Sequence, residues 1–386
     1  MEEKKKMTFN NKRGKTDYMV MGKGNDEIRT VTATIKKGHI PRVKEHKLVG
    51  SWLDETGTYG INIGKKKEKL QYMISSVKNQ ASPTKVGVYS VESRLGLAEI
   101  VIIPSILYNA EAFPHYKEEE IKKLESVQLT ILTGILEIPK TTPYCALLME
   151  VGWWTMRARL AYRKLMLYHN IVRSNEKRPL QKILNVQEEE RRRTTWLSST
   201  LAEIEKYNIT LDPKESLKST WKKEVKEKIT EMSEKEIREK CTNSKKARFV
   251  KNDKYEPKEY LLGNVSLPEV KKILKMRMNM NKVPGNYKGK WGATCPLCKK
   301  GEGDMEHYFE RKMVMQLRKV WDVKMDDLSN DDIKKMTSLA NFMENVETMI
   351  DPNQNSGYRG GICEAAKTKV SEDIGGHNED EDMKKR

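Results

Sequence analysis

The sequence predicts a mainly α-helical protein with a small β-rich segment near its N-terminus. In the middle of the chain, apolar residues recur every three or four positions, as one face of a helix requires. The densest of these stretches is 97–173. Near the N-terminus, Val31, Ala33 and Ile35 alternate with threonines, which is typical of a half-buried strand. Because only 37% of the residues are hydrophobic, we expect several small cores.

The first 80 residues are predicted to form a domain with a β-rich part followed by a helix. We expect strands at 28–35 and 43–53, with a turn at Lys37-Gly38 between them. Residues 61–80 carry apolar residues at helical spacing. Four lysines of this helix are expected to be exposed, namely Lys65, Lys66, Lys67 and Lys69.

A second domain, 81–175, is predicted to be a helical bundle. The run 118–136 is amphipathic and precedes a proline that stops it. Thr142-Pro143 starts a short helix, because a hydroxyl can cap the free amide groups and proline suits the first turn. Gly152 ends that helix, and another spans 155–173 with a basic outer face.

Residues 176–280 are predicted to form a charged helical connector. One apolar stripe at helical spacing is expected to pack against a core: Leu217, Trp221, Val225, Ile229 and Met232. The segment from Ser266 to Glu269 is a capping box that opens a further helix. On that helix we expect four basic residues to face outward, namely Lys271, Lys272, Lys275 and Arg277.

The rest of the chain divides into three regions. Residues 281–315 form a glycine-containing turn, and 316–350 are predicted to form short helices, with Asp331 and Asp332 near a helix start. Residues 351–386 are rich in glycine, asparagine and charge, so we expect a disordered tail.

The excess of positive charge predicts a polyanionic partner. Lys and Arg number 73 and Asp and Glu 55, which gives a formal net charge of +18. Nucleic acid is the commonest polyanion bound by such proteins, and the alternative is a solvated basic surface without a partner. The cations that we expect to contact phosphates first are Lys12, Arg13, Lys15, Arg157, Arg159, Arg163 and Lys164.

A second candidate nucleic-acid site mixes an aromatic residue with cations around the glycine-containing turn. Its residues are Lys288, Lys290, Trp291, Lys299 and Lys300. This mixture suits stacking on unpaired bases together with neutralisation of phosphates. Trp291 could equally form the small core of the turn, and the sequence leaves both interpretations open.

The sequence contains no signal for secretion or for a membrane span. The N-terminus lacks the apolar centre of a signal peptide, and no stretch of about 18 apolar residues is present. We therefore expect a nuclear or cytoplasmic protein that is not secreted. Its five cysteines do not form a disulfide framework, and in a reducing compartment a close cysteine pair more often binds metal. The oligomeric state stays open.

The most specific motif is a candidate metal site. Cys295 and Cys298 have two residues between them, a spacing that lets one tight turn place two thiolates on one ion. His307 follows after eight intervening residues. Two sulfurs and an imidazole suit zinc, although the fourth ligand is missing; Glu310, Asp304 or a water could supply it. The alternative is a glycine-rich turn with two free thiols.

Five segments, taken in order, resemble one protein family. They are FNNKRGKTDYMVM (9–21), HKLVGSWLDETG (46–57), SILYNAEAF (105–113), LESVQLTILTGILEIPKTTPYCALLMEVGWW (124–154) and RARLAYRKLMLYHNIVR (157–173). Together they resemble the reverse transcriptases of non-LTR (LINE-like) retrotransposons, over about residues 7–312. The resemblance departs from the family at Leu48-Val49-Gly50, where the family has a tyrosine–leucine–glycine turn, and in the spacing of the asparagine before Lys15-Thr16.

The resemblance implies an assignment for each region. It makes 1–80 a remnant of the catalytic palm, 81–175 a thumb-like domain and 176–280 a connector. Residues 281–315 are then similar to the family's zinc knuckle, whose fourth ligand is a cysteine a few residues beyond the histidine. Glu310, Arg311 and Lys312 occupy that part of this chain, so the knuckle is degenerate.

The resemblance also implies that the catalytic centre is missing. Polymerases hold two metal ions with clustered aspartates, and in this family those aspartates precede the segment that here starts near residue 1. Met325-Asp326-Asp327 has a helical, acidic context and is not a substitute. We therefore expect no catalytic residues and no magnesium site.

Together these observations predict a truncated reverse-transcriptase-like protein that binds nucleic acid, RNA or DNA, without regard to sequence and without polymerase activity of its own. One alternative is a non-catalytic helical scaffold or interaction protein. Another is an incomplete gene model of a full RNA-directed DNA polymerase.

Overall fold

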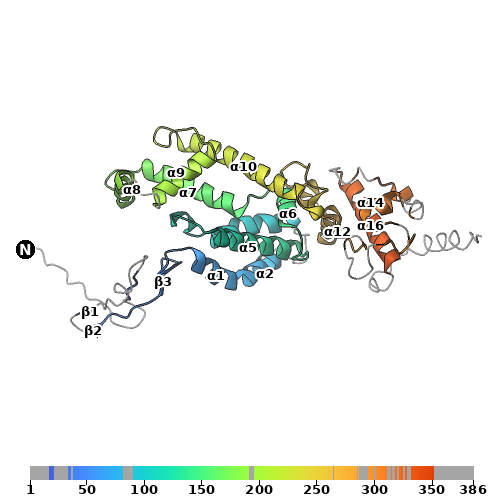
Figure 1. The fold of residues 1–386 in the computed structure, drawn as a ribbon, viewed down its shortest axis with the longest axis horizontal. Coiled ribbons are helices and arrows are strands. Elements are labelled where there is room, and N and C mark those ends of the chain that lie inside the picture. The colour runs from blue at the N-terminus through green and yellow to red at the C-terminus, as the bar shows by residue number, and fades with distance from the viewer. Residues whose placement is uncertain are drawn as a thin grey trace, which may run out of the picture. The chain divides into compact units, whose positions relative to one another are not determined.

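The computed structural model describes most of the chain between residues 38 and 351. The described residues are 17–20, 34–35, 38–80, 90–190, 195–263, 265–284, 286, 294–299, 301–310, 314, 318–319, 321–324, 327 and 332–351. They form a mainly helical protein with a small antiparallel β part near the N-terminus, which confirms the predicted fold class at this level (Figure 1).

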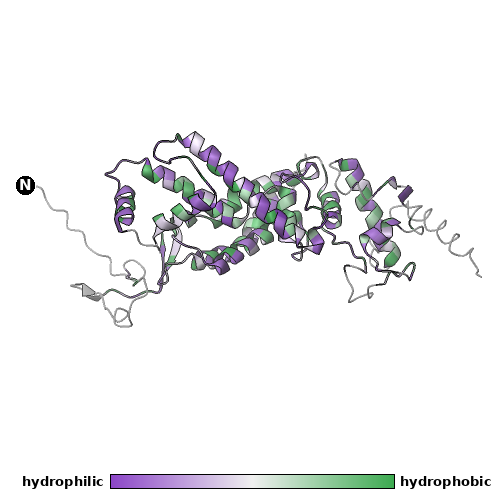
Figure 2. Ribbon diagram, turned by 45° about the horizontal axis from the view of Figure 1, so that its top comes forward, coloured by the Kyte–Doolittle hydropathy of each residue, from purple (hydrophilic) through white to green (hydrophobic). Residues whose placement is uncertain are grey.

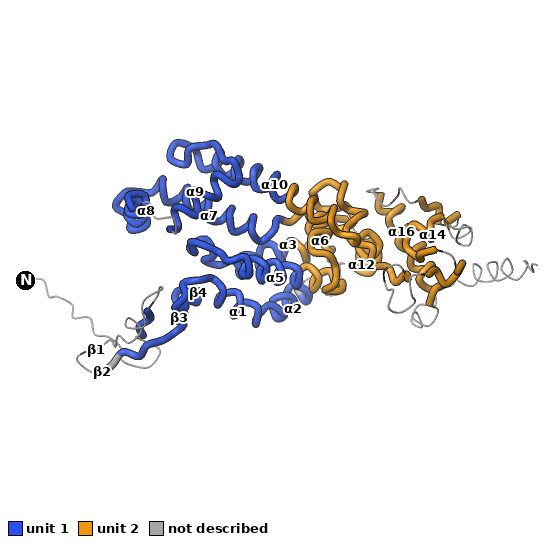
Figure 3. The backbone as a smooth tube through the Cα atoms, in the orientation of Figure 1, with its two compact units in different colours: residues 1–80, 96–131, 154–233 blue, residues 81–95, 132–153, 234–386 orange. Residues whose placement is uncertain are grey.

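The chain divides into two compact units, coloured separately in Figure 3. Unit 1 comprises 1–80, 96–131 and 154–233, and unit 2 comprises 81–95, 132–153 and 234–386. The region predicted as one helical bundle, 81–175, therefore contributes to both units.

The four described strands form two antiparallel pairs. β1 (Thr34–Ile35) pairs with β2 (Gly38–His39), and β3 (Glu45–Leu48) pairs with β4 (Ser51–Asp54). Val49 and Gly50 join β3 to β4 with φ of 46° and 83°, the left-handed conformations of a tight two-residue hairpin turn. The single strand predicted over 43–53 was wrong, because this turn divides it into two strands.

Helices form the rest of unit 1. They are α1 (Gly60–Glu68), α2 (Leu70–Gln80), the π-helical η2 (Ala98–Ile102), α4 (Ile103–Ile106), the 3-10 turn η3 (Ala110–Ala112), α7 (Met156–Val172), α8 (Pro179–Glu190) and α9 (Trp196–Lys206). Three helices have residues in both units, namely α3 (Val91–Leu97), α5 (Glu118–Leu136) and α10 (Lys218–Thr242). Apolar and polar stretches alternate along the helices (Figure 2), as expected where each buries one face.

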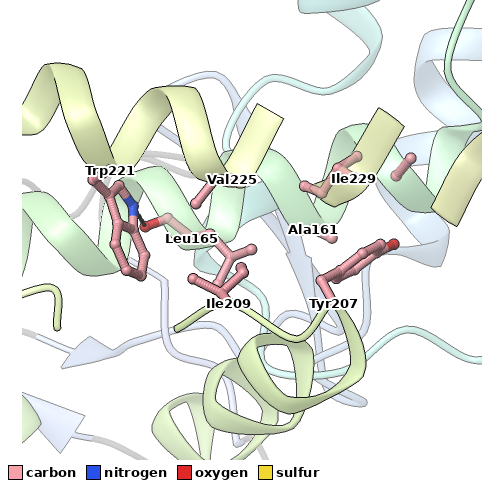
Figure 4. Close-up of a cluster of buried hydrophobic side chains, with 8 residues drawn as sticks. Ala161, Leu165, Tyr207, Ile209, Trp221, Val225 and Ile229 are labelled. Carbon is pink, nitrogen blue, oxygen red and sulfur yellow. Dashed lines mark hydrogen bonds between the residues drawn. The ribbon is translucent and has the colours of Figure 1, made fainter. Parts of the chain in front are cut away.

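The core of unit 1 contains the stripe predicted on α10. Trp221, Val225 and Ile229 are 0% exposed and pack with apolar side chains of α7 and with Tyr207 and Ile209 (Figure 4). The Trp221 indole N–H donates to the backbone oxygen of Leu165 at 3.3 Å, so the largest side chain of the stripe also satisfies its polar atom.

The structure contradicts the predicted exposure of two residues, Leu217 and Lys66. Leu217 precedes α10 and is 66% exposed, so it does not belong to the buried stripe. Lys66 was predicted to be exposed, but it is partly buried. Its amine donates to the Tyr59 hydroxyl at 2.8 Å and to the backbone oxygen of Ile106 at 2.9 Å. It thereby caps carbonyl groups at the end of α4.

The remaining helices belong to unit 2. They are α6 (Tyr144–Val151), the 3-10 turn η4 (Lys245–Ala247), α11 (Glu259–Leu262), α12 (Leu267–Arg277), α14 (Met305–Glu310) and α16 (Ile333–Ile350). Ser266 and Glu269 form the predicted capping box of α12, and Gly152 ends α6 with φ of 63°, as predicted. α16 has 18 residues and is longer than the short helices predicted over 316–350.

The acidic residues near α16 have structural roles. Asp332 caps α16 by accepting the backbone N–H of Lys334 at 2.8 Å, which confirms its predicted place at a helix start. Asp327 accepts the backbone N–H of Lys324 at 2.7 Å. Asp326 and Asp331 lie outside the described residues. Within the described part of the chain, no helix has the length and apolar content needed to cross a membrane.

Candidate metal centre

The two cysteines lie on a tight turn whose ends are tied by backbone hydrogen bonds. The Cys295 N–H donates to the Gly301 oxygen at 3.1 Å, and the Lys299 N–H donates to the Cys295 oxygen at 2.9 Å. Lys299 and Gly301 both have positive φ, 56° and 73°. These left-handed residues reverse the chain direction immediately after Cys298, and Thr294 forms an antiparallel bridge with Glu302.

α14 supplies the third side chain. Asp304 precedes this helix, and its carboxylate accepts the backbone N–H of His307 at 2.9 Å. This bond fixes the first turn of α14 and with it the position of the imidazole. Gly303 lies directly before this turn. A Cβ at this position would lie 2.9 Å from the Tyr308 hydroxyl and 3.2 Å from the Cα of Cys295, so glycine permits the close packing of turn and helix.

The structure brings the three predicted ligands together. Their ligand atoms lie within 4.8 Å of one another, and the Cys298 sulfur is 3.3 Å from Nε2 of His307. A tetrahedral zinc ion with its usual bond lengths separates a sulfur from a nitrogen ligand by about 3.6 Å. Cys295 is 1% exposed and His307 8% exposed, so the cluster is largely shielded from solvent. The trio can therefore hold a metal ion.

The surroundings favour the thiolate form of Cys295. Burial raises the pKa of this thiol. The Cys298 backbone N–H, the Tyr308 hydroxyl and the Leu297 backbone N–H lower the pKa by more than burial raises it, so the pKa is below its ordinary value. The Tyr308 hydroxyl is buried and has no hydrogen-bond partner among the described residues, and its pKa is raised by burial and by the neighbouring Cys295 thiol. Thiolates are the form that binds metal.

No fourth histidine, cysteine or acidic ligand joins the cluster among the described residues. Asp304, one of the candidates from the sequence, already accepts a hydrogen bond from His307. Glu310, the other protein candidate, is exposed at the end of α14. The described residues thus provide three ligands.

The basic residues predicted on α7 bond within the chain instead of presenting free charge. Arg157 pairs with Glu118 at 2.6 Å, Arg159 with Glu99 at 2.8 Å and Arg163 with Glu111 at 2.8 Å, all within unit 1. Lys164 is 4% exposed, and its amine donates to the Pro114 oxygen at 2.7 Å and to Ser199 at 3.0 Å. These four cations therefore hold α7 against its neighbours, and phosphate contact would compete with those bonds.

Most of the other predicted nucleic-acid residues lie outside the described residues, namely Lys12, Arg13, Lys15, Lys288, Lys290, Trp291 and Lys300. Lys299 is described, and it is exposed on the metal-site turn.

The structure leaves four lysines exposed on the β3–β4 hairpin and the neighbouring α1, and two of them, Lys67 and Lys69, were predicted to be exposed. Lys44 and Lys47 are exposed on and beside β3, and Lys67 and Lys69 are exposed at the end of α1, which packs on β4. We call these four lysines the hairpin lysines. The Val49 side chain at the tip of the same hairpin is 76% exposed. The three-residue spacing of Lys44 and Lys47 on a strand gave no signal, because it does not follow strand alternation.

Comparison with known proteins found no family model, no curated protein and no solved structure that matches this chain.

Proposed function

We propose that this protein is a non-catalytic nucleic-acid-binding polypeptide similar to the C-terminal part of a non-LTR reverse transcriptase, stabilised by zinc. The observation that carries the proposal is the convergence of Cys295, Cys298 and His307 from the turn and the helix that follows it. This convergence is what a zinc knuckle requires, and the knuckle was the most specific motif of the resemblance.

The donor set favours zinc in a structural role. Two thiolates and one imidazole suit zinc better than magnesium or calcium, which prefer oxygen ligands. Thiolate-rich sites of this kind serve to fold small modules, because the metal replaces a core that few residues can build. A water or a carboxylate completes the fourth position.

The charge of the chain supports a nucleic-acid partner. The net charge is +18, and the hairpin lysines form no ion pair with the described residues. Exposed lysines beside an exposed apolar hairpin tip suit binding along a nucleic-acid strand. The amines would neutralise phosphates, and the tip would contact sugars or bases. We therefore assign the first phosphate contacts to the hairpin lysines rather than to α7.

The metal assignment is tested by the zinc content of the full chain. We expect about one zinc ion per chain, released by a chelator, because the three ligands act together. Cobalt substituted for zinc is expected to give thiolate charge-transfer bands and the visible bands of a tetrahedral site. Cys298→Ala is expected to lose both signals, and Cys363→Ala, at a cysteine outside the described residues, is the matched control. Equal zinc content in the two variants would contradict the assignment.

Nucleic-acid binding is tested by fluorescence anisotropy with single-stranded RNA and DNA over a series of salt concentrations. If the hairpin lysines contact four phosphates, replacing all four with alanine is expected to reduce the slope of log K against log salt by about 3. The matched control replaces four exposed lysines on and before α10, namely Lys214, Lys218, Lys222 and Lys226, which removes the same charge. A drop of equal size in both variants would show that net charge, not this surface, supplies the affinity.

Primer extension tests the absence of catalysis. We expect no magnesium-dependent synthesis, since no cluster of carboxylates that could hold two metals is found among the described residues. Synthesis by the purified chain would overturn this part of the proposal.

A helical scaffold is the second candidate function. It is favoured by one observation, the pairing of the α7 cations with acidic side chains of the same unit, which uses basic residues for packing. Weak binding with a flat salt dependence in the anisotropy series would support the scaffold.

A further inference from the structure

Tyr108 presents an exposed aromatic ring beside the hairpin that carries Lys44 and Lys47. It lies two residues after α4 and is 44% exposed. The turn of the hairpin contacts the ring, because a Cβ built on Gly50 would lie 3.1 Å from Cε1 of Tyr108. The Asn109 side-chain amide donates to the Ser51 hydroxyl at 2.9 Å and ties the same two segments at a second point. All of these residues belong to unit 1.

Buried polar groups hold the backbone of Tyr108 in place. Its carbonyl oxygen accepts the Tyr59 hydroxyl at 3.1 Å and the Lys66 amine at 3.1 Å. Tyr59 is 0% exposed, so the anchor is part of the core. Asn109 follows with φ of 58°, a left-handed conformation that asparagine tolerates better than most residues. Because the ring stands on a fixed backbone, it loses little conformational freedom when it packs against a ligand.

Apolar side chains extend the exposed surface around Tyr108. At the tip of the hairpin, Leu48 is 53% exposed and Val49 76% exposed. On η2, Ile100 is 70% exposed, and Val101, seven residues before Tyr108, is 53% exposed. Seven residues are about two helical turns, so Val101 and Tyr108 share one side of the helix. Such exposed apolar residues gathered in one place mark a binding surface.

Cations lie beside the aromatic rings of this surface. The Lys66 amine is 5.8 Å from the centroid of the Tyr108 ring, and the Lys65 amine is 4.9 Å from that of the Trp52 ring on β4. The hairpin lysines are exposed on the same hairpin and on α1. This charge favours a polyanionic ligand over an apolar protein partner.

We propose that Tyr108 stacks on an unpaired base of a single-stranded nucleic acid whose phosphates contact the hairpin lysines. The inference rests on the proposed function, from which it takes the class of ligand, and it adds the residue that contacts the bases. Aromatic rings that stack on bases, next to amines that neutralise phosphates, are the combination by which proteins bind single strands. A base inside a duplex has both faces covered, so single strands are preferred.

Fluorescence anisotropy of the full chain loaded with zinc tests the stacking. The probes are a single strand of about 12 nucleotides, an abasic strand with the same phosphates, and a blunt duplex. We expect the strand with bases to bind about tenfold more tightly than the abasic strand, with the same dependence on salt. Tighter binding of the duplex than of the single strand would overturn the inference.

Three variants assign the difference to one ring. Tyr108→Ala should lower the affinity for the strand with bases about tenfold and leave the affinity for the abasic strand and the salt slope unchanged. Tyr108→Phe keeps a ring and should bind as the unchanged chain does. Tyr72→Ala is the matched control, because Tyr72 is 77% exposed on α2, and it should leave both affinities unchanged. Far-UV circular dichroism establishes that each variant is folded.

Photocrosslinking tests the contact without a variant. A single strand that carries 5-iodouracil is bound to the unchanged chain and irradiated, and the crosslinked peptides are identified by mass spectrometry. We expect the crosslink at Tyr108. Crosslinks found only at other residues would overturn the inference.

Two further outcomes separate the inference from the proposed function. Equal affinities for the strand with bases and the abasic strand, both with a steep salt dependence, would overturn the stacking and leave nucleic-acid binding in place. Weak binding of every probe with a flat salt dependence would overturn the proposed function and, with it, this inference.

A loss of affinity of the same size in Tyr108→Ala and Tyr72→Ala would also overturn the inference, because it would show that exposed rings in general, not the ring at the hairpin, contribute to binding.

Discussion

Arg277 illustrates how far a single side chain can depart from its helical pattern. Its place on α12 predicts exposure beside three lysines, yet it is 1% exposed. Its guanidinium donates to Glu150 at 2.7 Å and to Asp253, and the Tyr260 hydroxyl donates to Glu150 at 2.6 Å. Burial lowers the Arg277 pKa, but these carboxylates raise it more, so the charge is retained. The buried Lys258 amine lies 3.9 Å from Asp253, so the group holds two cations and two carboxylates and is neutral in total.

We expect Arg277→Met to lower the free energy of unfolding by about 3–5 kcal/mol, because it leaves Glu150, 0% exposed, without its counter-ion. Urea denaturation followed by circular dichroism measures the change. The control is Lys271→Met, on the same helix as Arg277. This replacement breaks the ion pair between Lys271 and Glu137. Lys271 and Glu137 are 34% and 31% exposed, so we expect a loss below about 1 kcal/mol. Similar losses in the two variants would contradict the role of Arg277.

Among the secondary-structure elements, α6 depends on the residue that ends it. Gly152 has φ of 63°, a conformation that glycine adopts without strain. A Cβ there would lie 2.7 Å from Cδ and 2.8 Å from the backbone nitrogen of Pro257. The end of α6 is therefore packed against backbone that cannot move aside as a side chain would.

Gly152→Ala is expected to destabilise the protein by about 1–3 kcal/mol through backbone strain and this contact. Gly64→Ala in α1 is the control, because Gly64 is helical with nothing within 4 Å of its added Cβ. That variant should gain about 0.5–1 kcal/mol from the helical preference of alanine. Thermal unfolding of both variants, compared with the unchanged chain, measures the opposite signs; a neutral Gly152→Ala would refute the expected strain.

For the molecule as a whole, we expect stability to pass through a maximum in mildly alkaline solution. Burial lowers the pKa of Lys66 and of Lys164 to about 8 from 10.5. Between these values the unfolded chain holds protons that the folded chain has lost, so stability rises with pH. Burial raises the pKa of Tyr59 and of Tyr116 above 10. Above pH 10 the unfolded chain loses those protons first, and stability falls.

Urea midpoints in the presence of a reductant should therefore be higher at about pH 9.5 than at about pH 8, and lower again at about pH 11. Lys164→Met removes one of the two lysines, so it should flatten the rise while leaving the fall. Tyr116→Phe should do the opposite. A midpoint that declines steadily from pH 8 would show that the buried lysines do not govern this range.

Much of the helical structure follows from the sequence, because its signals act over a few residues. The capping box at Ser266, the stop at Gly152 and the stripe through Trp221 all appear where predicted. The end of the stripe was wrong at Leu217, since α10 begins one residue later and nothing there covers the side chain. A periodic pattern predicts which residues share a face, not where the helix begins.

The metal trio was also predictable, since its spacing places three donors on one turn and the helix beside it. The ion pairs of the α7 arginines were not predictable from the sequence. Each arginine of α7 pairs with an acid between 39 and 60 positions earlier in the chain, and a count of charges cannot show such pairs. The excess charge predicts a polyanionic partner, but only the fold distinguishes the cations that pack from the hairpin lysines that remain exposed.

The amino-acid order alone gives the helical class, several helix ends and the three metal ligands, because hydrogen bonding and apolar periodicity are local. The folded chain adds what depends on long-range contact. It buries Arg277 against Glu150, 127 positions away in the sequence. The charge state of a side chain depends on its distance from other charges and on its exposure to solvent, and residues far apart in the sequence come together only when the chain packs.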